Sequence, residues 1–226
     1  MIMSFGTGAV DPFRRIMSCA SESNTETPMN NNRSVEFFDR QFEQQIHQTE
    51  GALNPFEQAA LPHLRGRVLD FGCGMGNLAL AAARAGCPVL ALDASEVAIA
   101  HLQQVAAAEG LPMQAQVADL SRYRVSGEFD TIVSIGLLMF LDCATAQRAL
   151  DDLQAHLVSG GALVVNVLVE GTTYMDMFDP DAHCLFARDF LQARLAGWQV
   201  IESGYQDFAA PGNTVKSFAT IVASKP

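Results

Sequence analysis

Three alternating glycines follow a short apolar stretch and offer a place where a nucleotide can bind. Gly72, Gly74 and Gly76 come after the apolar residues 68–71, and a run of helix-forming residues begins near Asn77. Glycine carries no side chain, so the backbone can pass close to a ligand there. The first N–H groups of a helix have no partner within it and can donate to that ligand.

The spacing of this loop separates two kinds of nucleotide cofactor. A dinucleotide-binding loop reads G-x-G-x-x-G and would place its third glycine at position 77, which is asparagine. The loop reads G-x-G-x-G instead, and Asp70 stands just before it. A carboxylate repels a pyrophosphate and attracts the cationic sulfonium and ammonium of S-adenosylmethionine. The residues therefore favour this positively charged cofactor, and a nicotinamide-dependent oxidoreductase is the alternative.

Two further acids close the next apolar runs. Asp93 ends the run 89–92 and is predicted to accept hydrogen bonds from both ribose hydroxyls. Asp119 follows the run 113–117 and is predicted to accept from the adenine amino group. An isolated aspartate at such a place is more often a helix cap or a turn former. Their combination with the glycine loop favours cofactor binding, because the carboxyl ends of parallel strands share one sheet edge.

The predicted cofactor site consists of these residues and their neighbours at the ends of four strands. It comprises Asp70, Gly72, Cys73, Gly74, Gly76, Asn77, Asp93, Ala94, Ser95, Ala118, Asp119, Leu120, Ser134, Ile135 and Gly136. Cys73 is interpreted as a small loop residue rather than a nucleophile, because nothing near it in sequence would lower the pKa of its thiol.

The chain around these residues alternates between strand and helix patterns. We expect strands at 67–71, 88–92, 113–117, 129–135, 161–168, 198–203 and 214–223, and helices at 77–85, 95–109, 144–157 and 187–196. Asn77 and Ser95 are predicted N-caps, and Gly110 is a predicted helix end. The last two strands form a hairpin through a loop that contains Pro211 and Gly212. The pattern predicts an α/β fold, a Rossmann-like three-layer sandwich with a seven-stranded, mostly parallel sheet and an antiparallel last strand.

The N-terminal residues differ in character from the rest. Residues 1–33 are rich in Ser, Asn, Thr and Met, which predicts a flexible arm. Residues 34–226 are expected to form one domain, in which lid helices within 34–64 precede the glycine loop.

Composition limits the partners of the chain. Its 25 acidic residues against 14 Lys and Arg give a net charge of -11, which opposes nucleic acids and anionic lipid surfaces. The five cysteines are scattered without a C-x-x-C pair, so we expect reduced thiols, no disulfide framework and no metal site. The apolar run 131–141 is too short to span a bilayer. We expect a cytoplasmic monomer or homodimer.

These residues resemble the class I S-adenosylmethionine-dependent methyltransferases. Residues 70–76 look like their first motif, Asp93 like their ribose acid and residues 129–134 like their fourth strand. Residues 138–142, 160–161 and 217–220 are similar to the tellurite-resistance methyltransferase family. That family has a His-Arg pair before its last strand, where residues 205–208 of this chain read Tyr-Gln-Asp-Phe. The resemblance implies methyl transfer from S-adenosylmethionine.

The acceptor side is expected to be built from the N-terminal helix, the segment after the fourth strand and the loop 170–186. Predicted substrate residues are Phe37, Phe38, Arg40, Phe42, Tyr174, Met175 and Phe186, with Met177 and Phe178 as further lining residues. The N-terminal aromatics are equally well explained as a seal between a helix and the domain. The density of Met and aromatic side chains suggests a small, partly apolar acceptor.

No residue is assigned as the catalyst. His47, Asp142, His183 and Asp207 are candidate bases, although each is more readily explained as a solvated or capping residue. In-line transfer from a sulfonium depends mainly on positioning and on exclusion of water, so a base is optional. A domain that binds S-adenosylmethionine without turnover is the third hypothesis.

Overall fold

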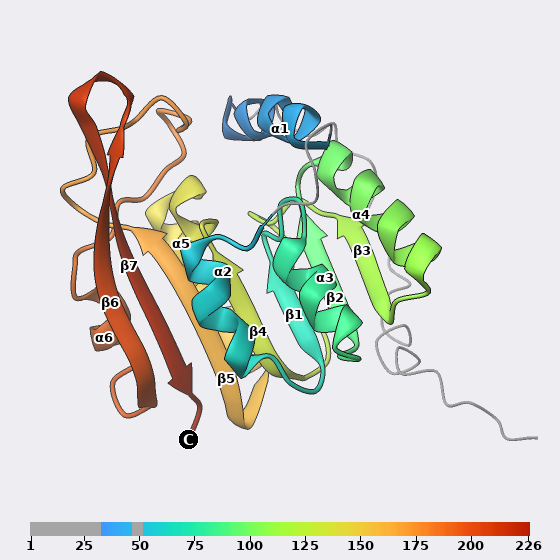
Figure 1. Cartoon of the computed structure of the whole chain (residues 1–226). Helices are drawn as coiled ribbons and strands as arrows, with labels where there is room; N and C mark the ends of the chain where they lie inside the picture. The colour runs from blue at the N-terminus through green and yellow to red at the C-terminus, as the bar shows by residue number, and fades with distance from the viewer. Residues whose placement is uncertain (1–32, 47–51) are drawn as a thin grey trace, which may run out of the picture.

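The computed structural model describes residues 33–46 and 52–226. The predicted arm at 1–33 therefore lies almost entirely outside the described residues. Within them the chain forms one twisted sheet with helices on both faces (Figure 1). This is the three-layer α/β arrangement that the alternating pattern predicts.

Seven strands of the described residues form the sheet, in the order β3-β2-β1-β4-β5-β7-β6. The strands β1 to β5 pair in parallel, whereas β7 runs antiparallel to both β5 and β6. The prediction of a mostly parallel sheet with an antiparallel last strand is confirmed. The strands are β1 (Val68–Phe71), β2 (Val89–Asp93), β3 (Met113–Val117), β4 (Phe129–Ile135), β5 (Leu157–Leu168), β6 (Gln199–Ala210) and β7 (Thr214–Ser224).

The helices α2, α3 and α4 cover one face of the sheet, and α5 and α6 cover the other (Figure 1). The helix α1 lies at the edge where the parallel strands end. The helical elements are α1 (Arg33–Ile46), α2 (Pro55–Ala60), η2 (Leu61–His63), α3 (Asn77–Arg84), α4 (Glu96–Glu109), η3 (Leu138–Phe140), α5 (Cys143–Ala155), α6 (Phe190–Arg194) and η4 (Pro211–Asn213).

The start of α3 differs from the prediction. Gly76 is the N-cap with a φ of 72°, and Asn77 is the first helical residue, so the predicted cap at Asn77 is wrong. A glycine is required at 76 because a Cβ there would lie 2.6 Å from the side chain of Leu102. The predicted ends of α4 are confirmed: the Ser95 hydroxyl accepts from the Ala98 N–H at 3.1 Å, and Gly110 ends the helix with a φ of 63°.

Three other predicted boundaries also differ from the structure. The helix predicted at 144–157 ends at Ala155, because Leu157 pairs with Phe129 and begins β5. The helix predicted at 187–196 is only α6, five residues long. The strand predicted at 198–203 is extended to Ala210, because β6 pairs with β7 along the whole hairpin.

Alternation along β5 divides its side chains between the two faces. Leu163, Val165 and Val167 lie in the main core with the helices α5 and α6. Val164 lies in a second cluster with Leu78 of α3 on the opposite face. Because the side-chain period of a strand is two, the next residue on that second face is Asn166.

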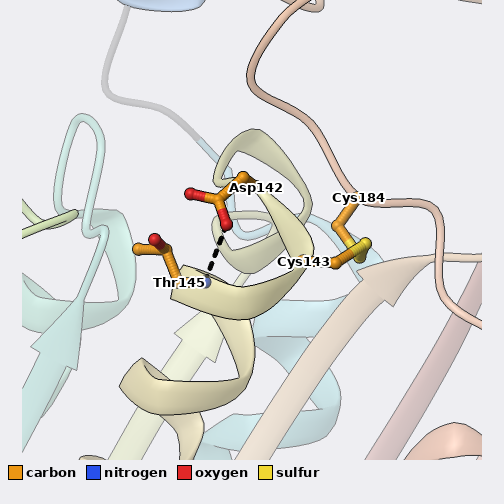
Figure 2. Close-up of a disulfide and its surroundings, with 4 residues drawn as sticks. All are labelled: Asp142, Cys143, Thr145 and Cys184. Atoms are coloured by element: carbon orange, nitrogen blue, oxygen red, sulfur yellow. Dashed lines mark hydrogen bonds between the residues drawn. A yellow bond between two sulfur atoms is a disulfide. The ribbon is translucent and has the colours of Figure 1, made fainter.

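Cys143 and Cys184 form a disulfide, so the expectation of reduced thiols is wrong for this pair. The bond joins the first residue of α5 to the loop that follows β5, as Figure 2 shows. A backbone contact holds the loop near the start of α5. The Cys184 N–H donates at 2.9 Å to the carbonyl of Met139, which lies in η3 just before α5. Two of the described cysteines, Cys73 and Cys87, are free.

Two expected absences concern membranes and metals. No helix within 33–46 and 52–226 is both long enough and apolar enough to cross a bilayer. Over the same ranges, no three His, Cys, Asp or Glu side chains gather in a way that could hold a metal ion.

Removal of the disulfide is expected to destabilise the fold. The bond closes a loop across a sequence separation of 41, so the double variant Cys143→Ser, Cys184→Ser should lose about 2 to 4 kcal/mol of unfolding free energy. Urea denaturation followed by circular dichroism measures this change. Cys87→Ser, which alters a free thiol, is the matched control and should unfold like the parent. A double variant as stable as Cys87→Ser would contradict the prediction.

Candidate active site

The glycine loop is held against the end of β2 by backbone and carboxylate contacts. The N–H groups of Gly72 and Cys73 both donate to the Leu92 carbonyl, at 2.8 and 2.9 Å. The Asp93 carboxylate accepts from the Gly74 N–H at 2.8 Å and from the Ser95 N–H at 2.9 Å. Asp93 therefore connects the loop with the start of α4 and faces the open edge between them.

Acidic groups gather at this end of the site. Asp70 is 5% exposed, and burial raises its pKa to about 8, with Glu57 and Asp93 adding to the rise. Burial also raises the pKa of Asp93, against the opposing effect of hydrogen bonds from Ser95 and Gly74. A cation bound here would relieve the repulsion between the carboxylates and favour their ionised forms.

Cys73 lies among these acids as a protonated thiol. Burial raises its pKa well above the usual value, and the charges of Asp93 and Asp70 raise it further. A thiolate nucleophile needs the opposite environment. The environment agrees with the interpretation of Cys73 as a small loop residue.

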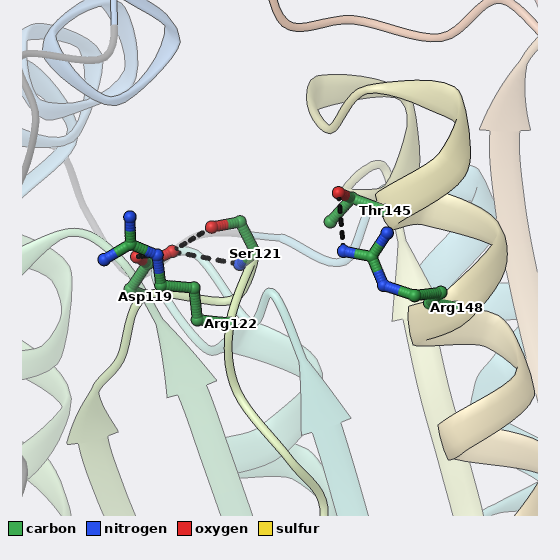
Figure 3. A network of polar contacts seen from close by, with 5 residues as sticks. All are labelled: Asp119, Ser121, Arg122, Thr145 and Arg148. Carbon is green, nitrogen blue, oxygen red and sulfur yellow. Dashed lines mark hydrogen bonds and ion pairs between the residues drawn. The ribbon is translucent and has the colours of Figure 1, made fainter.

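Asp119 lies after β3 in a turn that it stabilises itself. Its carboxylate accepts from the N–H of Ser121 at 3.0 Å and from the Ser121 hydroxyl, and it forms a 3.7 Å ion pair with Arg122 (Figure 3). The same view shows Arg148 of α5, which donates to the Thr145 hydroxyl at 2.9 Å. The turn-forming role considered for Asp119 is thus present, and its predicted contact with adenine remains a prediction.

A cleft of about 1490 Å³ runs along the carboxyl edge of the sheet. Twelve of the predicted cofactor residues lie on its wall: Asp70, Gly72, Cys73, Gly74, Asn77, Asp93, Ala94, Ser95, Asp119, Leu120, Ile135 and Gly136. The structure does not place Gly76, Ala118 and Ser134 there. Gly76 is turned against Leu102, the Ala118 N–H donates to the Asp93 carbonyl at 2.8 Å, and Ser134 is fully buried in β4.

The helix α1 covers part of this cleft. Phe37, Phe38 and Phe42 line it, and the ring of Phe38 contacts that of Phe140 with centroids 5.0 Å apart. These aromatics thus both line the cleft and attach the helix to the domain. Arg40 does not reach the wall, because its side chain is exposed and donates to the Glu36 carbonyl of its own helix.

Polar contacts hold α1 on both sides of the cleft. The Ser95 hydroxyl hydrogen-bonds to the Asp39 carboxylate, which ties the helix to the start of α4. At its other end, the Asp179 N–H donates to the Ser34 hydroxyl at 3.0 Å. The helix therefore bridges the start of α4 and the loop after β5.

The loop after β5 contributes fewer cleft residues than predicted. Met177 lines the cleft, whereas Tyr174, Met175 and Phe186 are not on its wall. Tyr174 lies under the Lys216 ammonium, Met175 is exposed to solvent, and Phe186 is buried against Phe190 with ring centroids 4.7 Å apart. Phe178 is likewise buried and contacts Phe140 rather than the cleft.

The terminal hairpin and α2 supply a wall that sequence reasoning missed. Cleft residues outside the predicted set include Phe56, Met139, Phe140, Asn166, Phe208, Lys216 and Phe218. The ring of Phe56 contacts those of Phe208 and Phe218 at 5.7 and 4.8 Å between centroids. The aromatic residues in the two hairpin strands were the signal in the sequence that could have indicated this wall. Only the fold shows that they contact α2.

The candidate bases have other structural roles. Asp142 lies on the cleft wall but caps α5, and hydrogen bonds from Thr145 lower the pKa of its carboxyl. His183 contacts the Asp179 carbonyl at 3.1 Å, and Asp207 is exposed on β6. Neither lies on the cleft wall. His47 lies outside the described residues.

A buried amide at the floor of the cleft lacks a partner on one side. The Asn166 Nδ2 donates to the Thr220 hydroxyl at 2.8 Å, whereas its Oδ1 accepts no hydrogen bond from the described residues. Asn166 is fully buried and lies on the cleft wall. An unpaired buried acceptor is costly, and Asn166 is one of the few such groups among the described residues.

Comparison with known proteins agrees with this geometry. Residues 68–161 match a family model described as a methyltransferase domain. The chain is 30% identical over 172 residues to Hemagglutinin 1 of Eikenella corrodens. The aligned region covers 71% of this chain and 55% of that protein. It is 28% identical over 168 residues to the probable S-adenosyl-L-methionine-dependent methyltransferase TehB of Haemophilus influenzae, covering 70% of this chain and 57% of TehB. The chain thus spans little more than half the length of these curated relatives.

The fold is shared with a solved structure of the same relative. The crystal structure of TehB from Haemophilus influenzae superposes with a TM-score of 0.67 at 22% identity, covering 85% of this chain and 67% of that one. The glycine loop and Asp93 lie within the matched family model. TehB is named as dependent on S-adenosyl-L-methionine, the cofactor that the glycine loop and Asp70 favour in this chain. Residues 68–161 thus match a methyltransferase domain, and the chain resembles TehB, a probable S-adenosyl-L-methionine-dependent methyltransferase.

Proposed function

We propose that this chain transfers the methyl group of S-adenosylmethionine to a small, partly apolar acceptor. One observation carries the proposal: the cleft continues without a break from the acids Asp70 and Asp93 into a section walled by aromatic and methionine side chains. Asp70 and Asp93 line the part of the cleft that would hold S-adenosylmethionine, which would supply an electrophilic methyl carbon to the acceptor and leave as S-adenosylhomocysteine.

The residues of the chain would position the two molecules and exclude water. The Asp93 carboxylate can accept from ribose hydroxyls with the lone pairs that the Gly74 and Ser95 N–H groups leave free. The helix α1 covers the cleft through Phe38 and Phe42, which limits water at the reacting atoms. The product of a neutral acceptor would lose its proton to solvent once it leaves the covered part of the cleft, so the transfer itself needs no base.

The charge of the chain supports a small acceptor over a nucleic acid. A net charge of -11 repels a phosphate backbone, whereas a small molecule can enter the cleft beneath α1. Radiolabelled methyl transfer across a panel of small thiols, hydroxyls, amines and acids tests the proposal. Binding of the cofactor without transfer to any acceptor would favour a non-catalytic domain.

Loss of the Asp93 carboxylate should weaken cofactor binding. Asp93→Ala removes the predicted ribose contacts and the acceptor of two backbone N–H groups, so the affinity for S-adenosylhomocysteine should fall by about 10- to 100-fold. Isothermal titration calorimetry measures the affinity. Asp176→Ala, which removes an exposed carboxylate away from the cleft, is the control. Equal affinity of Asp93→Ala and the parent would contradict the role of Asp93.

Binding of the cationic cofactor should release a proton from Asp70. With a pKa of about 8, the Asp70 carboxyl is mostly protonated at neutral pH, and a nearby sulfonium favours its ionised form. The affinity for S-adenosylmethionine should therefore rise with pH until about pH 8 and then level off. Calorimetry in buffers of different ionisation enthalpy measures the released proton, and Asp70→Asn should lose that release. If Asp70→Asn released the same proton on binding, the proton would come from another group and the prediction would be wrong.

A further inference from the structure

The cleft has opposite charges at its two ends. The acids Asp70 and Asp93 lie at the ends of β1 and β2, whereas Lys216 lies on β7. The strand β7 is three positions away from β1 in the sheet, a separation of about 14 Å. The end that suits a cationic cofactor is thus well separated from the end that carries a cation.

Lys216 faces the same side of the sheet as the apolar acceptor wall. Lys216, Phe218 and Thr220 alternate along β7 and therefore share a face. Phe218 pairs with Leu168 of β5, and Thr220 pairs with Asn166, whose amide oxygen is unpaired. Along this column the cleft passes from a hydrogen-bond acceptor, over an aromatic ring, to an ammonium.

Lys216 differs from the other basic residues on the cleft wall. Arg84 is paired with Glu109, and Arg122 with Asp119. Lys216 has no carboxylate within ion-pair distance in the described part of the chain, and its ammonium lies 4.7 Å from the centre of the Tyr174 ring. The tyrosine orients the ammonium without neutralising it.

We propose that Lys216 determines acceptor specificity by binding a carboxylate on an apolar acceptor, whose body lies against Phe56, Phe208 and Phe218. This inference rests on the proposed methyl transfer and names its substrate class, an apolar carboxylic acid. Burial lowers the pKa of Lys216, and a bound carboxylate compensates for that burial. The charge-assisted contact would orient the acid so that its other end points along the cleft toward the cofactor.

A matched pair of probes separates charge from shape. The probes are naphthalene-2-carboxylate and naphthalene-2-carboxamide, titrated by fluorescence into protein saturated with S-adenosylhomocysteine. The parent should bind the carboxylate about tenfold more tightly than the amide. Equal affinities for the two probes would overturn the proposal.

Three variants assign the preference to Lys216. Lys216→Met keeps most of the side-chain length and should abolish the preference for the carboxylate, while its affinity for the amide stays unchanged. Lys216→Arg should retain the preference. Arg188→Met is the matched control, because Arg188 also lies over a tyrosine ring, that of Tyr205, but outside the cleft. A preference that survives Lys216→Met, or that is lost equally in Arg188→Met, would overturn the proposal.

Cofactor affinity distinguishes this inference from the proposed function. All three variants should bind S-adenosylhomocysteine like the parent, which also shows that they fold. If the parent fails to bind S-adenosylhomocysteine, the proposed function itself fails. If the parent binds it but transfers methyl groups equally well to acidic acceptors and to their amides, only the role of Lys216 fails.

Discussion

The Asp93 carboxylate is the interaction on which the site depends. One of its oxygens accepts from the Gly74 N–H and the other from the Ser95 N–H, so a single side chain sets the loop after β1 and the start of α4 against each other. Burial raises the pKa of this carboxyl, whereas the two hydrogen bonds lower it, and the residue still lies on the cleft wall. Fixing the loop in advance means that a ligand does not have to order it, which favours binding.

The charge of the site follows from where the strands end. Asp70 and Asp93 end up close together because β1 and β2 are parallel neighbours. Burial raises the pKa of Asp70 to about 8, with the charges of Glu57 and Asp93 adding to the rise, so a bound cation would favour its ionised form. The cation at the other end, Lys216, comes from a strand that runs in the opposite direction. The antiparallel hairpin thereby brings a residue from the last part of the chain to the carboxyl edge.

Three long-range connections hold α1 and the loop after β5 at the cleft. The disulfide between Cys143 and Cys184 attaches the loop after β5 to the start of α5. The same loop reaches α1 through Asp179 and Ser34, while α1 reaches α4 through Asp39 and Ser95. The cover of the cleft is therefore connected to both walls, one of which carries a covalent crosslink.

The sequence alone determined the sheet, the glycine loop and the acids beside it, because these depend on local periodicity and on short spacings. The cap at Gly76 was missed, since the steric demand there comes from Leu102 on another helix. The pairing of Cys143 with Cys184 and the approach of Phe56 to Phe208 and Phe218 were decided by the tertiary structure. The tertiary structure also decided the position of Lys216, because this residue belongs to no motif and is placed only by the pairing of β7 with β6. The predicted cofactor site is built from neighbouring parts of the chain, whereas the aromatic wall of the cleft is assembled from parts that only folding brings together.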